Sequence, residues 1–282
     1  MNTSAFLFWL ASYPRSGNTW LRLLVGSCLA GGTPVDINRF KFAEMRARTR
    51  LLFDDAIGVA SASLDTETIL RWRAEAIRTW AAELDAACHI KTHDARTRSG
   101  DGGAVLIPAE VTRGAVYLVR DPRDVAISLA RFLKIDVDRA IDLMGKPESM
   151  ADLSGDRMRP LLPDYWSSWS HNVESWLDWH EIAPRLVRYE DLRREPEGVL
   201  ADILTALGLS FPQGTIRAAV AAVDLGVLQD QERRSGFVEA PPRVRFFGAG
   251  AVGGWRDTLT PEQAQRIVDD HGRVMRRVGY DA

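Results

Sequence analysis

One stretch decides the fold of this chain, namely Phe6-Leu-Phe-Trp-Leu-Ala-Ser-Tyr-Pro-Arg-Ser-Gly-Asn-Thr-Trp20. Its first half, 6–12, is a continuous apolar run of the kind that forms a strand buried on both faces of a parallel sheet. A loop of turn-forming residues follows. From Trp20 the apolar residues recur with helical spacing until Gly31 and Gly32, which are expected to stop the helix. The stretch therefore predicts a strand, a loop and a helix in that order.

The same alternation of strands and helices continues along the chain. Further strands are expected over 88–92, 114–119 and 185–189. Further helices are expected to begin after the capping residues Asp65, Asp121 and Thr260, the last two of which precede a proline that suits a first helical turn. The alternation predicts one α/β domain over residues 1–282, with a central, mostly parallel sheet flanked by helices.

One long segment, between Ile135 and Pro163, has no regular period. Irregular insertions of this length are commonly lids or binding loops, so we expect this one to lie on the substrate side. The helical stripe that follows it, with Trp166, Trp169 and Trp176, either packs in the core or lines the acceptor side.

Composition excludes several classes of protein. A net charge of -2 over 282 residues provides no general field that would hold nucleic acid or an anionic membrane. Two cysteines, and no clustered His, Cys or acidic residues in the sequence, predict neither a disulfide framework nor a metal site. The first apolar run is far shorter than the roughly 20 residues of a membrane span, so a cytoplasmic protein is expected. No amphipathic stripe calls for a protein partner.

The loop after the first strand carries residues suited to bind an anion. The N-terminus of a helix presents amide groups and a dipole that favour negative charge. Gly17 permits close approach of the backbone, Arg15 supplies positive charge, and the neutral donors are Ser16, Asn18 and Thr19. The alternative is a tight turn with Arg15 facing solvent. The loop is P-loop-like in position only, because the pattern G-x-x-x-x-G-K-[ST] is absent, which argues against ATP or GTP.

Two more strand ends carry candidate functional residues. Arg120 ends the strand 114–119 at a helix N-terminus, and Ser128 lies two turns into that helix. Lys91 and His93 end the strand 88–92, and a histidine with an ordinary pKa can accept a hydroxyl proton near neutral pH. Taken alone, Arg120 could be an ion-pair residue and His93 a structural histidine. Ligands of parallel sheets gather at the carboxyl ends of strands, where Arg120, Lys91 and His93 are expected.

Together these motifs resemble the PAPS-dependent sulfotransferases, both the cytosolic type and bacterial natural-product relatives, where PAPS is 3′-phosphoadenosine 5′-phosphosulfate. The family loop Tyr-Pro-Lys-Ser-Gly-Thr-Thr-Trp is matched over 13–20, with Arg15 in place of Lys and Asn18 in place of Thr. The family's Arg and the Ser eight residues later are matched by Arg120 and Ser128. Three more family motifs follow in this chain: Lys91-Thr-His93, Tyr189-Glu-Asp191 and Gly253-Gly-Trp255.

The resemblance implies an enzyme that moves the sulfuryl group of PAPS to a hydroxyl, or an amine, of a small-molecule acceptor without a metal ion. It implies that His93 is the general base and that Lys91 and Arg15 stabilise the departing oxygen. The cofactor-binding residues are then expected to be Arg15, Ser16, Gly17, Asn18, Thr19, Trp20, Arg120, Ser128, Tyr189, Arg245 and Gly250.

One departure from the family pattern affects the expected site. The family has Arg-Lys-Gly before its late Gly-x-Trp, whereas this chain has Gly248-Ala-Gly250. We expect Gly250 to keep its place beside the cofactor, and Arg245 or Arg243 to supply the missing charge. Two other functions stay open: a P-loop-type nucleotide-dependent kinase, and a catalytically silent protein that binds PAPS or its product PAP, adenosine 3′,5′-bisphosphate.

Overall fold

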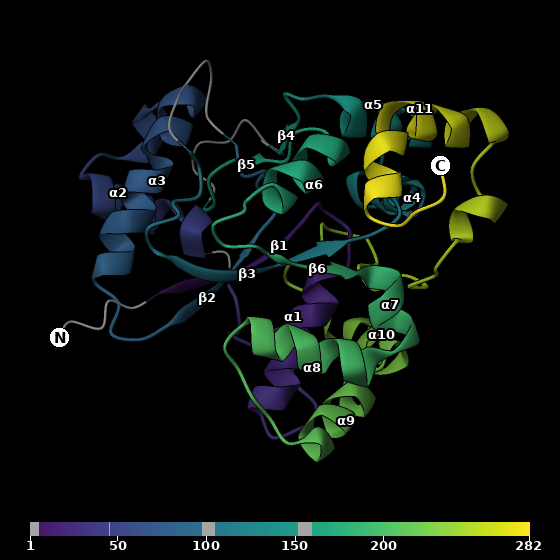
Figure 1. The fold of residues 1–282 in the computed structure, drawn as a ribbon, viewed down its shortest axis with the longest axis horizontal. Coiled ribbons are helices and arrows are strands. Elements are labelled where there is room, and N and C mark those ends of the chain that lie inside the picture. The colour runs from purple at the N-terminus through teal and green to yellow at the C-terminus, as the bar shows by residue number, and fades with distance from the viewer. Residues whose placement is uncertain (1–5, 45, 98–104, 152–159) are drawn as a thin grey trace. The chain divides into compact units, whose positions relative to one another are not determined.

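The structure is a computed structural model that describes residues 6–44, 46–97, 105–151 and 160–282 (Figure 1). The chain forms two compact units, each made of three segments. Unit 1 comprises Met1–Tyr13, Ala43–Tyr117 and Lys146–Leu186, and unit 2 comprises Pro14–Phe42, Leu118–Gly145 and Val187–Ala282. The single domain expected over 1–282 stays a prediction.

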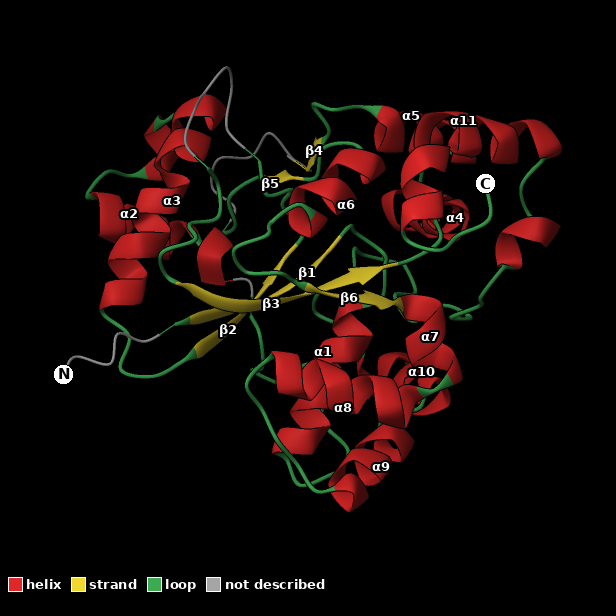
Figure 2. Cartoon of the chain, viewed as in Figure 1, coloured by secondary structure: helices red, strands yellow, loops and turns green. Residues whose placement is uncertain are grey.

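Among the described residues, four strands form one sheet in the order β2-β1-β3-β6 (Figure 2). The strands are β1 (Leu7–Ser12), β2 (Cys88–Thr92), β3 (Thr112–Val119) and β6 (Arg185–Arg188). β1 and β2 are parallel, with Leu7 opposite Cys88 and Ala11 opposite Thr92, so their carboxyl ends lie at one edge. Helices flank this parallel sheet, and the predicted α/β fold is confirmed.

Unit 1 contains two helices that pack against each other, α2 and α3. The start of α3 follows the sequence prediction, because the side chain of Asp65 accepts a hydrogen bond from the Thr68 amide at 2.7 Å. The bounds of the remaining elements of unit 1 are α2 (Arg50–Ile57), α3 (Thr66–Ala82), α6 (Trp169–Leu177), η1 (Arg46–Arg48), η2 (Ser61–Ser63), and the antiparallel pair β4 (Met150–Ala151) and β5 (Asp164–Tyr165).

The tryptophans of α6 belong to the core of unit 1. Trp176 is fully buried, and its ring centroid lies 6.5 Å from that of Trp9 and 6.1 Å from that of Tyr117. Its indole nitrogen donates to the Asp94 carbonyl at 3.0 Å. Large buried aromatic rings supply much apolar burial, so the core-packing interpretation of the tryptophan stripe is confirmed.

Unit 2 contains the helices that follow the predicted anion loop and the two remaining predicted caps. The carboxylate of Asp121 accepts from the Arg123 amide at 3.0 Å, and Thr260 forms a capping box with Gln263. Both predicted helix starts are confirmed. The elements are α1 (Asn18–Leu29), α4 (Pro122–Leu133), α5 (Val137–Gly145), α7 (Tyr189–Arg194), α8 (Pro196–Ala206), α9 (Gln213–Ala222), α10 (Leu225–Ser235), η3 (Gly254–Asp257) and α11 (Pro261–Arg277).

The expectation that the segment 135–163 has no regular period is wrong, because α5 occupies Val137–Gly145. Ala140, Ile141 and Met144 are buried on this helix, which packs against α4 and α11. Local signals for α5 are present in the sequence: the Asp136 carboxylate accepts from the Arg139 amide at 2.7 Å, and the apolar residues 137, 140, 141 and 144 have helical spacing. Residues 152–159 of the expected lid lie outside the described residues, and its role on the substrate side stays a prediction.

Candidate functional site

The loop between β1 and α1 has a backbone that only glycine accommodates at one position. Gly17 has a φ of +100°, and a Cβ there would lie 2.6 Å from Cδ2 of Tyr189. Arg15 also lies in the left-handed region, with a φ of +67°. Gly17 precedes α1 and contributes no side-chain cap to its first turn. The backbone and the N-terminal end of α1 therefore suit an anion in this loop.

Ser16 and Arg120 each have a buried polar atom that lacks a hydrogen-bond partner among the described residues. These atoms are the Ser16 hydroxyl oxygen and Nε of Arg120. The other Arg120 nitrogens donate to the carbonyls of Arg15 at 3.2 Å and Ala251 at 2.9 Å, which fixes the guanidinium beside the loop. Unpaired buried polar atoms cost free energy, and the oxygens of a phosphate or sulfate group are suitable partners for both. The residues present therefore fit a phosphorylated ligand.

Arg15 brings a second cation and a hydroxyl to the same place. Its Nε donates to the Ser128 hydroxyl at 3.1 Å, and its guanidinium carbon lies 4.6 Å and 4.4 Å from the ring centroids of Phe132 and Phe246. Burial, followed by the nearby cations including Arg120, lowers the pKa of Arg15 to about 10. Arg15 is still protonated at neutral pH, so the site concentrates positive charge.

Aromatic rings border this cationic group. The Tyr189 ring lies 4.6 Å from the Arg120 guanidinium carbon, and its hydroxyl donates to the Gly250 carbonyl at 3.1 Å. The Trp20 ring lies edge-on to Tyr189 with centroids 6.0 Å apart, and its indole nitrogen donates to the Val223 carbonyl at 3.1 Å. Two fixed aromatic side chains beside cations suit a purine base attached to phosphates.

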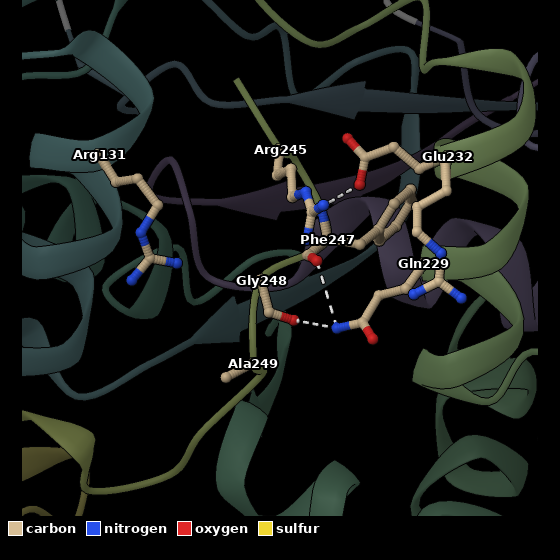
Figure 3. Close-up of a pocket in the computed structure, with 8 residues that line it drawn as sticks. Arg131, Gln229, Glu232, Arg245, Phe247, Gly248 and Ala249 are labelled. Carbon is tan, nitrogen blue, oxygen red and sulfur yellow. Dashed lines mark hydrogen bonds between the residues drawn. The ribbon is translucent and has the colours of Figure 1, made fainter. Parts of the chain in front are cut away.

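A pocket of about 590 Å³ lies in unit 2 and includes one of the two arginines expected to supply the missing charge (Figure 3). Arg245 lines it, whereas Arg243 is not among its lining residues. Arg131, which was not predicted from the sequence, also lines the pocket. It follows Ser128 by three positions in α4, and this spacing places the two side chains on one face of the helix. The lining residues are Arg131, Gln229, Glu232, Arg233, Arg245, Phe247, Gly248 and Ala249.

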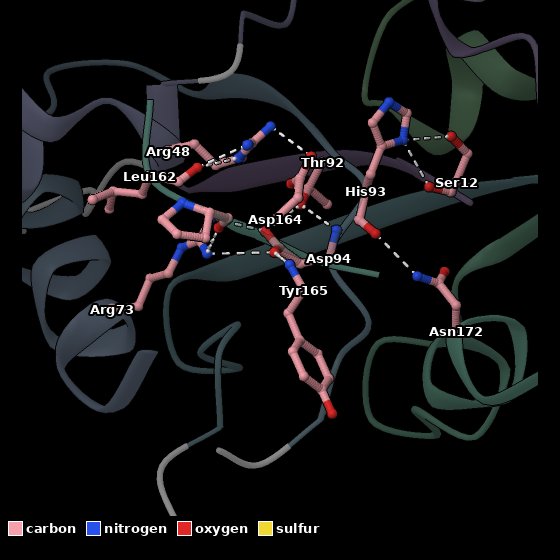
Figure 4. Close-up of polar contacts among 11 residues, drawn as sticks. Ser12, Arg48, Arg73, Thr92, His93, Asp94, Leu162, Asp164, Tyr165 and Asn172 are labelled. Atoms are coloured by element: carbon pink, nitrogen blue, oxygen red, sulfur yellow. Dashed lines mark hydrogen bonds and ion pairs between the residues drawn. The ribbon is translucent and has the colours of Figure 1, made fainter. Parts of the chain in front are cut away.

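Unit 1 holds the predicted base, His93, immediately after β2. Its Nδ1 lies 2.8 Å from the Ser12 carbonyl oxygen and 3.2 Å from the Ser12 hydroxyl (Figure 4). A carbonyl oxygen can only accept, so the shorter contact assigns the proton of the neutral ring to Nδ1 and leaves a lone pair on Nε2. The side-chain amide of Asn172 donates to the His93 carbonyl at 3.0 Å and fixes the backbone.

The surroundings of His93 keep it neutral. Burial, followed by the positive charge of Lys91, lowers the pKa of His93 well below its usual value of 6.5, although the bond to Ser12 opposes the shift. Lys91 is 6% exposed and lies in β2, two residues before His93. At neutral pH the imidazole is therefore in the form that can accept a proton.

A buried ion-pair network lies behind His93 and was not predicted from the sequence. Asp94 binds the Arg73 guanidinium at 2.9 Å and accepts from the Tyr165 amide at 2.7 Å (Figure 4). Arg48 and Asp164 form a second pair at 2.6 Å. These partners come from distant parts of the sequence, so their pairing has no local signal. The network fixes the residue that follows the predicted base.

Over the described ranges, no group of three or more His, Cys, Asp and Glu side chains could hold a metal ion. Within the same ranges, no helix combines the length and apolar character needed to cross a membrane.

Comparison with known proteins identifies the family. The model of the sulfotransferase domain matches residues 105–279. Cytosolic sulfotransferase 13 of Arabidopsis thaliana is 26% identical over 274 residues, which cover 92% of this chain and 73% of the relative. Retinol dehydratase, solved with androsterone and the inactive cofactor PAP, has a similar fold, with a TM-score of 0.60, 18% identity and coverage of 98% and 82% of the two chains. A mouse sulfotransferase complexed with PAP has a TM-score of 0.60 and 16% sequence identity, and the match covers 96% of this chain and 85% of the mouse chain. The chain therefore belongs to the sulfotransferase family, as its sequence motifs predict.

Proposed function

We propose that this sulfotransferase takes the sulfuryl group from PAPS and transfers it to a hydroxyl group of a small-molecule acceptor in the cytoplasm. The observation that carries the proposal is the cationic group around the loop after β1. There Arg15 and Arg120 are held together, with the unpaired Ser16 hydroxyl and the left-handed Gly17 in the same loop. The solved relatives named above contain PAP, which supports the same ligand class for this chain.

The residues of unit 2 divide between the two ends of the nucleotide. The loop residues Arg15, Ser16 and Gly17, with Asn18 and Thr19 at the start of α1, would hold the 5′-phosphosulfate through backbone and side-chain donors. Arg120 and Ser128 would hold the 3′-phosphate. Trp20 and Tyr189 would contact the adenine, with Gly250 fixed beside Tyr189 by its hydrogen bond.

His93 would act as the general base. The Ser12 carbonyl holds the Nδ1 proton, so Nε2 is the atom that accepts the acceptor's hydroxyl proton. As this proton leaves, the acceptor oxygen forms a bond to sulfur, and the bond from sulfur to the bridging phosphate oxygen breaks. PAPS supplies the transferred sulfuryl group and departs as PAP.

Arg15 and Lys91 would stabilise the negative charge that develops on the bridging oxygen. Both are cations that are held in place, Arg15 by Ser128 and two phenylalanine rings, and Lys91 by its position in β2. Cations fixed before the reaction lower the barrier because they need no reorganisation as charge develops. This electrostatic role requires no metal ion.

The acceptor class follows from the relatives only in outline. The structure of retinol dehydratase with retinol and PAP, and the one with androsterone, hold small apolar molecules that carry a hydroxyl group. We propose an acceptor of this kind for the present chain, a small hydroxyl compound with an apolar body.

The proposal is tested by assaying sulfated product and PAP when the protein is given PAPS with retinol, a hydroxysteroid or a simple phenol. We expect turnover by the wild type, and a loss of about 10²- to 10⁴-fold in kcat for His93→Ala, the usual contribution of a general base. His180→Ala is the matched control, because His180 is exposed. PAP affinity should be the same in all three proteins.

Several outcomes would contradict this proposal. Full turnover by His93→Ala would remove the base assignment, and a strict requirement for added magnesium would contradict metal-free transfer. Tight binding of PAP without turnover of any acceptor would favour the catalytically silent binding protein.

A further inference from the structure

The strongest feature that the proposed function leaves unexplained is the exposed arginine on α4 that faces the altered segment 248–250. Figure 3 shows the Arg131 side chain extending from its helix toward Gly248, with Arg245 on the same loop as Gly248. Both arginines line the pocket described above. Arg233 of α10 lines it too, so the pocket contains cations from three different segments of unit 2.

The fit between Arg131 and Gly248 is steric. A Cβ added at Gly248 would lie 2.6 Å from a terminal nitrogen of Arg131, so any larger residue there would displace the guanidinium. The backbone of Gly248 is not in the left-handed region, and its torsion angles do not themselves demand glycine. The glycine at 248 therefore provides the space that Arg131 occupies.

Three arginines and one carboxylate, that of Glu232, line the pocket. Neither Arg131 nor Arg245 forms an ion pair with another residue in the described part of the chain. Glu232, the acidic residue of the pocket, instead accepts hydrogen bonds from the backbone amides of Phe246 at 2.6 Å and Phe247 at 3.0 Å. The positive charge of Arg131 also contributes to the lowered pKa of Arg15. The pocket therefore carries an excess of positive charge, which favours an anion.

Resting on the proposed function, we propose that Arg131, assisted by Arg245, binds the 3′-phosphate of the nucleotide. Ser128, one turn earlier on the same face of α4, is a residue proposed above for that phosphate. The loop residues 248 and 249 carry no charge, so the cation would come from the helix instead. In this chain the cation for the phosphate would lie on α4 and not on the loop, and Gly248 leaves space for the Arg131 side chain.

The experiment compares two nucleotides that differ only in the 3′-phosphate. Isothermal titration measures the Kd of PAP and of 5′-AMP for the wild type, Arg131→Ala and the control Arg139→Ala. Arg139 lies on α5, is exposed and carries the same charge, but does not line the pocket. We expect Arg131→Ala to weaken PAP about tenfold to a hundredfold, the loss of one charge-assisted hydrogen bond, and to leave 5′-AMP unchanged.

A double variant tests the relocation of charge directly. Arg131→Ala combined with Gly248→Arg returns a guanidinium to the loop, and the space vacated by Arg131 accommodates the new side chain. This protein should regain most of the PAP affinity that the single Arg131→Ala variant loses. Gly248→Arg alone should bind PAP less tightly than the double variant does, because its side chain competes with Arg131 for space.

The outcomes separate this inference from the proposed function. Unchanged PAP affinity in Arg131→Ala would overturn the inference. The proposed function would still be supported if the wild type binds PAP. An equal loss for PAP and 5′-AMP would also overturn the inference, because the effect would not involve the 3′-phosphate. Absence of PAP binding by the folded wild type would refute the proposed function together with the inference.

Discussion

Replacing Gly17 by alanine tests whether the loop after β1 and the Tyr189 ring form one preorganised unit. The new methyl carbon would lie 2.6 Å from Cδ2 and 2.9 Å from Cε2 of Tyr189, which is closer than van der Waals contact allows. The φ of +100° is also unfavourable for alanine. The ring must move, and its hydrogen bond to the Gly250 carbonyl at 3.1 Å is then lost.

The loss of stability follows from the left-handed backbone at position 17 and from the lost hydrogen bond of Tyr189. A left-handed conformation costs a residue with a Cβ about 1–2 kcal/mol, and the lost hydrogen bond adds about 0.5–1.5 kcal/mol. We therefore expect Gly17→Ala to lower the free energy of unfolding by about 1.5–3.5 kcal/mol, as measured by urea denaturation. PAP affinity, measured by titration, should fall as well, because Tyr189 and the loop both belong to the proposed nucleotide site.

Gly26→Ala, in the helix α1 that Gly17 precedes, is the matched control. A Cβ at Gly26 would meet no atom within 4 Å, and its backbone is helical. Alanine there should leave the free energy of unfolding unchanged or raise it by up to about 1 kcal/mol, since alanine favours a helix over glycine. Equal stability and PAP affinity of Gly17→Ala and the wild type would refute the reasoning, and so would equal destabilisation by the two substitutions.

Two further predictions concern unit 1. Because the pKa of His93 is lowered, its ring stays neutral as the pH falls through 6.5. We therefore expect kcat/KM to remain constant around pH 6.5 and to decline only at more acidic pH. A decline in kcat/KM centred at or above pH 6.5 would contradict this prediction. Arg73→Ala leaves the buried Asp94 carboxylate without its partner and should lower the free energy of unfolding by about 3–5 kcal/mol in urea denaturation. The control Arg71→Ala, from an exposed pair with Glu67 on the same helix, should cost less than about 1 kcal/mol, and equal losses would show that burial is not the cause.

Features with local signals were predicted from the sequence. Asp65, Asp121 and Thr260 each cap the helix that they were expected to begin, because a side chain and an amide two or three residues later suffice for a cap. The buried strand β1 follows equally well from its continuous apolar run. The structure also holds Arg15, Ser128 and Arg120 around the same loop, and their role in binding the nucleotide stays a prediction.

Two kinds of feature were missed. Helix α5 was overlooked although it has local signals, because the Asp136 carboxylate accepts from the Arg139 amide and the buried positions 140, 141 and 144 recur with helical spacing. The pair of Arg73 and Asp94 joins residues 21 positions apart, and its burial becomes apparent only in the fold. Arg131 had one weak signal, its spacing from Ser128, but its relation to Gly248 joins α4 to a distant loop.

The most direct test of the central claim is a titration of the wild type and Arg120→Ala with PAP and, separately, with ATP and magnesium. The account predicts that the wild type binds PAP, that Arg120→Ala binds it at least about tenfold more weakly because a charge-assisted hydrogen bond is lost, and that ATP with magnesium binds poorly to both. Binding of ATP with magnesium in the absence of PAP binding would contradict the account and favour a nucleotide-dependent kinase.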